Sequence, residues 1–256
     1  MIAPGPAPRR VPWLSFLSPV LLVLLWEAAS LAPASPLPGP LEVAGALGRL
    51  AAGGELLSDF GRTLLRAAAA FALSMLLGTG IGLLLGRVRQ ADQLFGSWVL
   101  IALNMPAVIV GILLYIWLGL TDLALVLAVV VSKVPLVAVT VRQGVRSLRA
   151  EFDELADALV LPPRARLAHV LLPQLVPYLL ASARNGLALV WKLVLVFEVL
   201  GSDGGVGFRV ALFFQNFDVT SILAYALGFI GIVLAVERLV LAPLERHLLR
   251  WQPVRS

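Results

Sequence analysis

Two lysines stand inside long apolar runs, where an ammonium group can attract an anion. Lys133 lies among valines, and Lys192 follows Trp191 directly. A charged side chain within a bilayer costs roughly 2.5–3.5 kcal/mol on insertion scales, and such residues usually face a bundle interior or a water-filled cavity. Both lysines and Trp191 are therefore candidates to line a path for an anion. Alternatively, each lysine pairs with a carboxylate such as Glu198, or extends its ammonium to the membrane surface.

The residue types that catalysis needs are scarce in this chain. There is no cysteine, which excludes disulfides, thiolate metal sites and cysteine nucleophiles. The two histidines, His169 and His247, are far apart in sequence, and no metal-ligand or catalytic-triad spacing is present. No Gly-rich phosphate loop of the Walker type occurs. These features argue against a membrane-embedded enzyme, and no metal site or cofactor is predicted in this chain.

The composition indicates a membrane protein. The chain of 256 residues is 60% hydrophobic and only 14% charged, which leaves too little polar surface for a soluble domain. Apolar runs of about 20 residues recur, and each is long enough to cross a hydrocarbon core of ~30 Å. The predicted fold is all-α and polytopic, with six transmembrane helices at Trp13–Ala32, Thr63–Leu85, Gly96–Leu118, Leu123–Val141, Gln174–Leu200 and Ser221–Leu241.

The remaining segments divide the chain into three parts. Residues 1–32 hold the N-terminal segment and the first helix, which we expect to be retained, although a signal peptide would also fit the arginine pair followed by an apolar run. Residues 33–59 form an external part, in which the run PASPLPGP cannot continue a helix and Leu41–Ala52 is predicted to be a short interfacial helix. Residues 60–256 form the core of five spans, with Ser202–Val219 as a Gly-rich outer loop.

The arginines set the expected orientation. If the N-terminus lies inside, the opposite side holds only Arg49 and Arg209 in its connecting segments, with Arg62 and Arg66 at the start of the second span. An excess of basic residues marks the cytoplasmic side, so both termini are predicted to be cytoplasmic. The arginines on that side are Arg9, Arg10, Arg87, Arg89, Arg142, Arg146, Arg149, Arg164, Arg166, Arg246, Arg250 and Arg255.

The longest polar interval, residues 142–173, separates the fourth and fifth spans. A helix with a small, approachable surface is expected around residues 154–158, and Pro162–Pro163 ends or bends it. A second short helix is expected at residues 164–172, just before Pro173. Two short helices joined by a turn would form a compact cytoplasmic knob. The residues alone leave open whether this knob binds a partner or is an ordinary solvated loop.

A sequence pattern within the knob resembles the EAA loop of permease subunits in bacterial ABC importers. Residues 154–160 read ELADALV and, after a gap of nine residues, residues 170–173 read VLLP. Similarity to the nitrate/sulfonate/taurine branch extends over about residues 33–252, and includes Thr63–Arg66, Ala183–Gly186 and the tail LLRW at 248–251. Val160 departs from the pattern, because the family has a glycine there. A glycine permits a left-handed backbone that a β-branched residue disfavours.

The resemblance implies a type I ABC importer permease fold whose knob docks into a separate ATPase subunit. Glu154 and Asp157 would provide polar contacts, and Arg164 and Arg166 would pair with acidic groups of the ATPase. The small and aliphatic residues would pack against the partner. The implied ATPase-coupling residues are Glu154, Ala156, Asp157, Ala158, Leu159, Val160, Arg164 and Pro173.

The same resemblance implies the partners. The chain would pair with a second copy of itself and with two ATP-binding subunits, which would hold ATP and Mg. An extracytoplasmic substrate-binding protein would deliver the solute to the Ser202–Val219 side. The implied location is the bacterial inner (cytoplasmic) membrane, within the lipid bilayer, and no nucleic acid is involved.

The remaining polar residues complete the hypothesis. Glu198 is interpreted as structural or gating at the outer end of the fifth span, because the family commonly has an acid there. Arg184 is expected to bond neighbouring backbone or a carboxylate. Asn104 either lines the pore or forms an interhelical hydrogen bond. Lys133 and Lys192 favour a small anionic solute of the sulfonate, taurine or nitrate type. The alternatives are a pyrimidine vitamin precursor or another aromatic solute, or a secondary transporter or channel, for which no internal repeat is evident.

Overall fold

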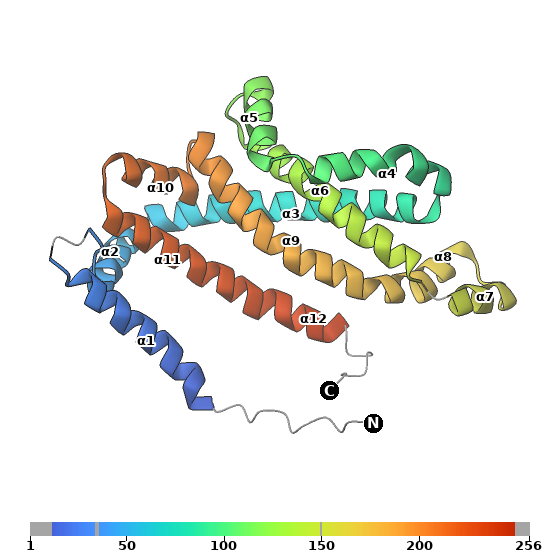
Figure 1. Ribbon diagram of the computed structural model, residues 1–256, viewed down its shortest axis with the longest axis horizontal. Coiled ribbons are helices and arrows are strands. Elements are labelled where there is room, and N and C mark those ends of the chain that lie inside the picture. Colours follow the sequence, from blue (N-terminus) through green and yellow to red (C-terminus); the bar gives the residue numbers. More distant parts are fainter. Residues whose placement is uncertain (1–11, 34–35, 149, 249–256) are drawn as a thin grey trace.

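The computed structural model describes residues 12–33, 36–148 and 150–248, and all regular elements in these ranges are helices (Figure 1). Four helical segments are long and apolar enough to cross a membrane: Glu55–Arg87, Asp122–Arg146, Arg164–Gly201 and Val219–Leu248. A bent pair of helices makes a fifth if it is counted as one span. The all-helical, multi-pass architecture is thus confirmed, whereas the six spans remain a prediction. The two terminal arginine groups lie largely outside the described residues.

The first helix lies apart from the others. Helix α1 (Pro12–Ser30) leads to α2 (Pro40–Ala52), which confirms the short helix predicted after the Pro-rich run. Trp26 Nε1 donates a hydrogen bond of 3.0 Å to the carbonyl of Pro38, which fixes the turn between α1 and α2. Helix α2 then packs against α11 through Val43 and Ala46. Figure 1 shows α1 extending away from the bundle beyond this contact.

A rigid pair of helices forms the centre of the bundle. Helix α3 (Glu55–Arg87) packs along α6 (Asp122–Arg146) through glycines at every fourth position. A Cβ built on Gly78, Gly82 or Gly86 would come within 2.5–2.7 Å of Val137, Val141 or Val145, respectively. Small residues at such spacing let two membrane helices approach closely. This seam therefore fixes α3 and α6 together over most of their lengths.

The predicted third span is not continuous. Helix α4 (Arg89–Leu103) and helix α5 (Ala107–Leu118) meet at a bend of 95°. Pro106 lacks a backbone N–H and disfavours the helical conformation of the residue before it, so the helix ends at Asn104. Figure 1 shows α5 turned away from α4 toward the end of α9. The prediction of a transmembrane helix over Gly96–Leu118 did not include this break, and the two helices together still count as one bent span or as a re-entrant loop.

The two ends of the bundle carry different short elements, which lie at opposite ends of Figure 1. At one end are α7 (Ala150–Ala158), α8 (Pro163–Arg166) and the π-helical turn η1 (Leu167–Leu171), which continues into α9 (Leu172–Gly201). At the other end lies α10 (Val206–Gln215). The two short helices of the knob are confirmed. The outer loop was expected to lack regular structure, and α10 corrects that prediction.

The chain closes with one long segment. Helix α11 (Val219–Val236) continues through a second π-helical turn, η2 (Glu237–Leu241), into α12 (Ala242–Leu248). The side chain of Asp218 caps the start of α11 by accepting a 3.0 Å hydrogen bond from the backbone N–H of Ser221. This segment returns from the α10 end toward the knob end beside α9 (Figure 1).

Candidate functional site

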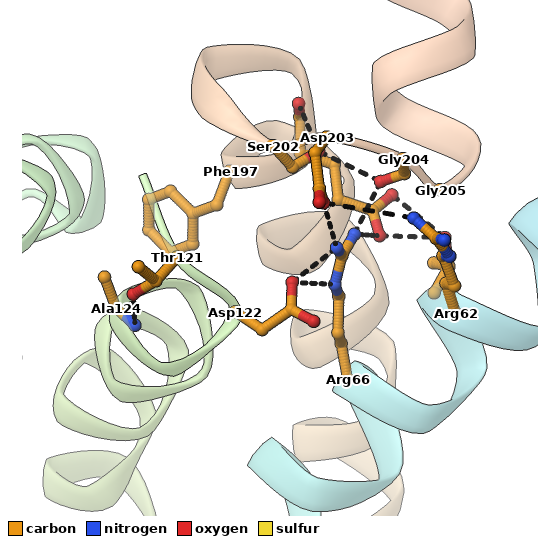
Figure 2. Close-up of polar contacts among 12 residues, drawn as sticks. Arg62, Arg66, Thr121, Asp122, Ala124, Phe197, Ser202, Asp203, Gly204 and Gly205 are labelled. Carbon is orange, nitrogen blue, oxygen red and sulfur yellow. Dashed lines mark hydrogen bonds and ion pairs between the residues drawn. The ribbon is translucent and has the colours of Figure 1, made fainter. Parts of the chain in front are cut away.

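Arg66 is the centre of a buried polar cluster at the α10 end of the bundle (Figure 2). Its side chain is only 4% exposed. Nη1 donates to Glu198 Oε1 at 2.8 Å and to the carbonyl of Gly204 at 2.6 Å, while Nε donates to Asp122 Oδ1 at 2.9 Å. Asp203 lies 3.4 Å from Nη2 on the exposed side. One guanidinium thus links α3, the start of α6, the end of α9 and the loop that follows it.

Glu198 has a full set of donors around it. Its side chain is completely buried, and it accepts hydrogen bonds from Thr63 Oγ1 at 2.9 Å and from the backbone N–H of Gly207 at 2.8 Å, besides the bond from Arg66. A buried carboxylate is tolerated when it is paired and its oxygens are hydrogen-bonded. Glu198 therefore fixes the end of α9 to both α3 and α10, and it is not the counter-ion of Lys192.

The start of α10 explains the glycines of the outer loop. The backbone N–H groups of Gly205, Val206 and Gly207 donate to Asp59, Thr63 and Glu198, so three otherwise unpaired donors of this helix end are satisfied by side chains. Gly205 has a φ of 102°, which L-residues rarely adopt. A Cβ on Gly205 would also clash with the Glu198 carboxylate. The loop must therefore have glycine at this position to let Glu198 reach the helix end.

A second ion pair lies beside the first. Arg209 Nε donates to Asp59 Oδ2 at 2.7 Å, and Tyr225 contributes a hydroxyl hydrogen bond of 3.1 Å to the same oxygen. Burial by itself lowers the pKa of the Arg209 guanidinium, but the hydrogen bond and charge of Asp59, with the charge of Glu55, raise it above its ordinary value. The residue therefore stays cationic and anchors α10 to α3.

Sequence reasoning identified only Glu198 of this cluster as a site residue. A signal for the rest was available, because Asp59, Thr63 and Arg66 are spaced by four and three residues in an otherwise apolar helix. Such spacing puts polar residues on one helix face, and a polar face within a membrane span requires partners.

The structure places the two lysines in different environments. Lys133 is fully buried, and its Nζ lies 4.0 Å from the centroid of the Phe71 ring and against Gly186 of α9. Within the described residues, this Nζ has no hydrogen-bond partner. Lys192 is exposed at the surface of the protomer, with no ion pair to any described residue. Lys133 is thus enclosed between α3, α6 and α9 in this conformation, whereas Lys192 is exposed, and the path role of each stays a prediction.

The structure also places the other predicted site residues, Trp191, Asn104 and Arg184, in different surroundings. Trp191 is 7% exposed and packs edge-on against Phe229, with 5.8 Å between ring centroids. Asn104 is exposed, but its amide donates to the carbonyl of Leu100 in its own helix at 2.8 Å. Asn104 therefore caps the end of α4 and forms no interhelical bond within the described protomer. Arg184 lies 3.7 Å from Glu237 and 3.6 Å from Glu245.

The first helix of the knob is terminated by Val160, whose backbone is left-handed. The family pattern has a glycine at this position, and glycine adopts this conformation at low cost. Val160 has a φ of 49°, the N–H of Leu161 donates to the carbonyl of Ala156, and the N–H of Val160 donates to that of Asp157. These bonds define a Schellman motif, in which the left-handed position usually holds glycine. Val160 thus adopts the glycine conformation despite its branched side chain.

The knob presents an apolar surface beside its charges. Leu155, Leu159 and Val160 are 54%, 62% and 85% exposed. Ala156, which is expected to contact a partner, is only 2% exposed, and it lines a small pocket of the knob with His169 and Pro173. Its assignment as a contact residue stays a prediction. Further predicted coupling residues on the surface are Glu154, Asp157, Ala158 and Arg164, and Pro173 is half-buried.

These features define a multi-pass helical membrane protein with a knob of short helices at one end and an ion-paired cluster at the other. Residues 78–242 match the family model of the binding-protein-dependent transport system inner membrane component. The chain therefore belongs to this family of ABC importer permeases, in its nitrate/sulfonate/taurine branch.

Two curated relatives and one solved structure illustrate the similarity. A putative aliphatic sulfonates transport permease, SsuC of Bacillus subtilis (strain 168), is 25% identical over 251 residues, which are 96% of this chain and 91% of the relative. The taurine transport permease TauC of Escherichia coli (strain K12) is 26% identical over 241 residues, 91% and 86% of the two chains. A structure of the MetNI methionine ABC transporter in inward-facing conformations has a TM-score of 0.65 and 18% identity, covering 75% of this chain and 95% of that one.

Proposed function

We propose that this chain is the transmembrane subunit of an ATP-driven importer that moves a small anionic solute of the sulfonate, taurine or nitrate type across the bacterial cytoplasmic membrane. It acts as a homodimer with two ATP-binding subunits, which hold ATP and Mg, and with an external binding protein that delivers the solute to the α10 end. The observation that carries this proposal is the exposed, unpaired ammonium of Lys192 in the middle of a span.

The depth of Lys192 in its helix argues against a position facing lipid. Lys192 lies nine residues before Gly201, which is about 14 Å below the outer end of α9 at a rise of 1.5 Å per residue. Side chains of a helix tilt toward its N-terminus, so Lys192 points away from the nearer, outer surface. An ammonium at this depth requires a partner or water. A second copy of the chain and a water-filled path between the copies would provide both.

The face of α9 that carries Lys192 supports the same conclusion. Its exposed residues recur every three or four positions and are mostly small or polar: Ala181, Asn185, Ala188, Lys192, Val196 and Val199. A lipid-facing stripe would be uniformly apolar, whereas this stripe becomes polar toward the knob. We assign this stripe, with Lys192 at its middle, to the wall of the solute path.

Uptake by cells tests the role of Lys192. In cells lacking the chromosomal copy, Lys192→Met should reduce uptake of radiolabelled ethanesulfonate by at least tenfold at equal protein level, and Lys192→Arg should retain most of it. Arg62→Met, an exposed cation near the outer end, is the matched control and should leave uptake near the wild-type value. Uptake by Lys192→Met that equals the wild type would refute the path assignment.

The partner ATPase is tested at the knob. Glu154→Arg combined with Asp157→Arg should abolish recovery of the ATP-binding subunit with the detergent-solubilised chain, because both charges are exposed next to the apolar surface of the knob. Glu42→Arg, at the opposite end of the molecule, serves as the control and should leave recovery unchanged. Equal recovery of the ATP-binding subunit with the wild type, the double variant and Glu42→Arg would show that the knob is not the docking surface.

A further inference from the structure

A cavity of about 310 Å³ opens between α9 and the π-helical turn η2. It extends from Trp191, near the depth of Lys192, toward Leu241 at the knob side of the membrane. Ala188, on the cavity wall, lies one helical turn before Lys192, so the cavity adjoins the stripe assigned to the solute path. Its volume is at the lower end of the ~300–1,000 Å³ range of small-molecule sites. The cavity is thus placed and sized to hold a small solute.

The wall of this cavity carries one charge of each sign. Arg184 and Glu237 face each other with Nη2 and Oε1 3.7 Å apart, and Glu245 lies 3.6 Å from Nη1. Both distances exceed a direct hydrogen bond, and the side chains are partly exposed, so these pairs hold the groups weakly. Glu237 also begins a π-helical turn, a feature frequent at functional sites. The guanidinium and the carboxylate can therefore both bond to a ligand.

Trp191 supplies a third polar group. Its ring borders the cavity, its side chain is more than nine-tenths buried, and its Nε1 has no hydrogen-bond partner among the described residues. A buried tryptophan N–H usually has an acceptor. Leu187 and Val233 add apolar wall between the polar groups. Because this nitrogen is shielded in the present conformation, the Trp191 ring must turn toward the cavity before an oxygen of a bound solute can accept from its N–H.

We propose that this cavity is an inner binding subsite for a small zwitterion, in which an acidic group accepts from Arg184 and Trp191 and an amino group donates to Glu237. The inference rests on the proposed function and narrows its solute class. A zwitterion replaces one weak ion pair by two charge-assisted hydrogen bonds, which are among the stronger ones in proteins. A simple anion would leave Glu237 unpaired beside a second negative charge.

Binding by the full chain in lipid nanodiscs tests the subsite. By titration calorimetry, the wild type should bind 2-aminoethanesulfonate at least tenfold more tightly than ethanesulfonate, which lacks only the amino group. Glu237→Gln should abolish this preference, because it weakens the binding of 2-aminoethanesulfonate and leaves the binding of ethanesulfonate unchanged. Arg184→Gln should weaken both ligands at least tenfold, and Trp191→Phe should weaken both several-fold. Arg238→Gln is the matched control and should leave binding of both ligands unchanged. Arg238 lies in the same π-helical turn as Glu237 but does not line the cavity.

Three results would overturn the subsite: equal affinities of the two ligands for the wild type, an unchanged preference in Glu237→Gln, or no binding of either ligand at millimolar concentration. Each variant must unfold within a few degrees of the wild type, which separates loss of a contact from loss of structure. If uptake in cells still depends on Lys192 while these binding results fail, the proposed function stands and only the inner subsite is wrong.

Discussion

The ion pair between Arg66 and Glu198 should dominate the stability of the α10 end of the bundle. Replacing Arg66 by methionine leaves the Glu198 carboxylate fully buried with only Thr63 and the Gly207 N–H as donors. Removing one partner of a buried pair costs about 3–5 kcal/mol, because the remaining charge is uncompensated. For a chain of this size, 1 kcal/mol corresponds to a Tm change of roughly 2–4 °C, so a loss of roughly 6–20 °C is expected.

Two further variants make this reasoning falsifiable. Arg62→Met changes an arginine one turn earlier in α3, which is 52% exposed and 4.0 Å from Asp203, and should cost less than about 1 kcal/mol. In Arg66→Met combined with Glu198→Gln, the glutamine keeps acceptors for Thr63 and Gly207 without the charge, so the double variant should be more stable than Arg66→Met alone. Thermal unfolding in one detergent provides all values. Equal Tm losses in Arg66→Met and Arg62→Met would refute the argument.

Three other predictions concern packing and backbone strain. Gly82→Ala should lower the free energy of unfolding by about 1–3 kcal/mol, since its Cβ would meet the Ala138 carbonyl at 2.7 Å. Gly80→Ala has open space around it and should stabilise the protein slightly. Denaturant titration compares the two variants. Val160→Gly should raise Tm slightly, because a left-handed non-glycine residue costs about 1–2 kcal/mol, partly offset by the greater chain entropy of glycine; an equal or lower Tm would contradict the strain. Lys133→Met should raise the free energy of unfolding by about 1–3 kcal/mol and retain uptake, because it removes a buried amine without a hydrogen-bond partner among the described residues. Loss of uptake at equal protein level would show instead that Lys133 acts in the solute path.

The helical fold was predictable because apolar length and polar breaks are direct consequences of the membrane. The spans at residues 123–141 and 174–200 match α6 and α9 closely. Both short knob helices also follow from the sequence, because the first contains small residues and the proline pair separates it from the second. The bend at Asn104–Pro106 was missed because proline is tolerated in some membrane helices, so its presence alone does not fix a break. Helix α10 was missed because its glycines were taken as loop residues, whereas Gly205 directly precedes the helix, Gly207 lies in its first turn, and both leave room for Glu198, which caps it.

The polar sites were less predictable because their partners are distant in sequence. Arg66 and Glu198 are separated by 132 residues, and no local pattern reveals which buried charge meets which. Val160 shows the opposite case. Its identity argued against a left-handed backbone, but the hydrogen bonds of the turn and the burial of Ala156 impose that backbone on it. Tertiary and turn constraints thus override the intrinsic preference of a single residue.

Helix α9 shows why the two intramembrane lysines needed the structure to be distinguished. Its residues divide by face: Val190, Val194, Phe197 and Glu198 are buried, and Ala188, Lys192 and Val196 are exposed. A lysine on the exposed face of this helix has no partner within the protomer, whereas Lys133 lies in α6, whose mid-span residues contact α3 and α9 on several sides. Both lysines have the same apolar sequence surroundings. Only the number of neighbouring helices separates a cation held inside the bundle from one that requires water or a second copy of the chain.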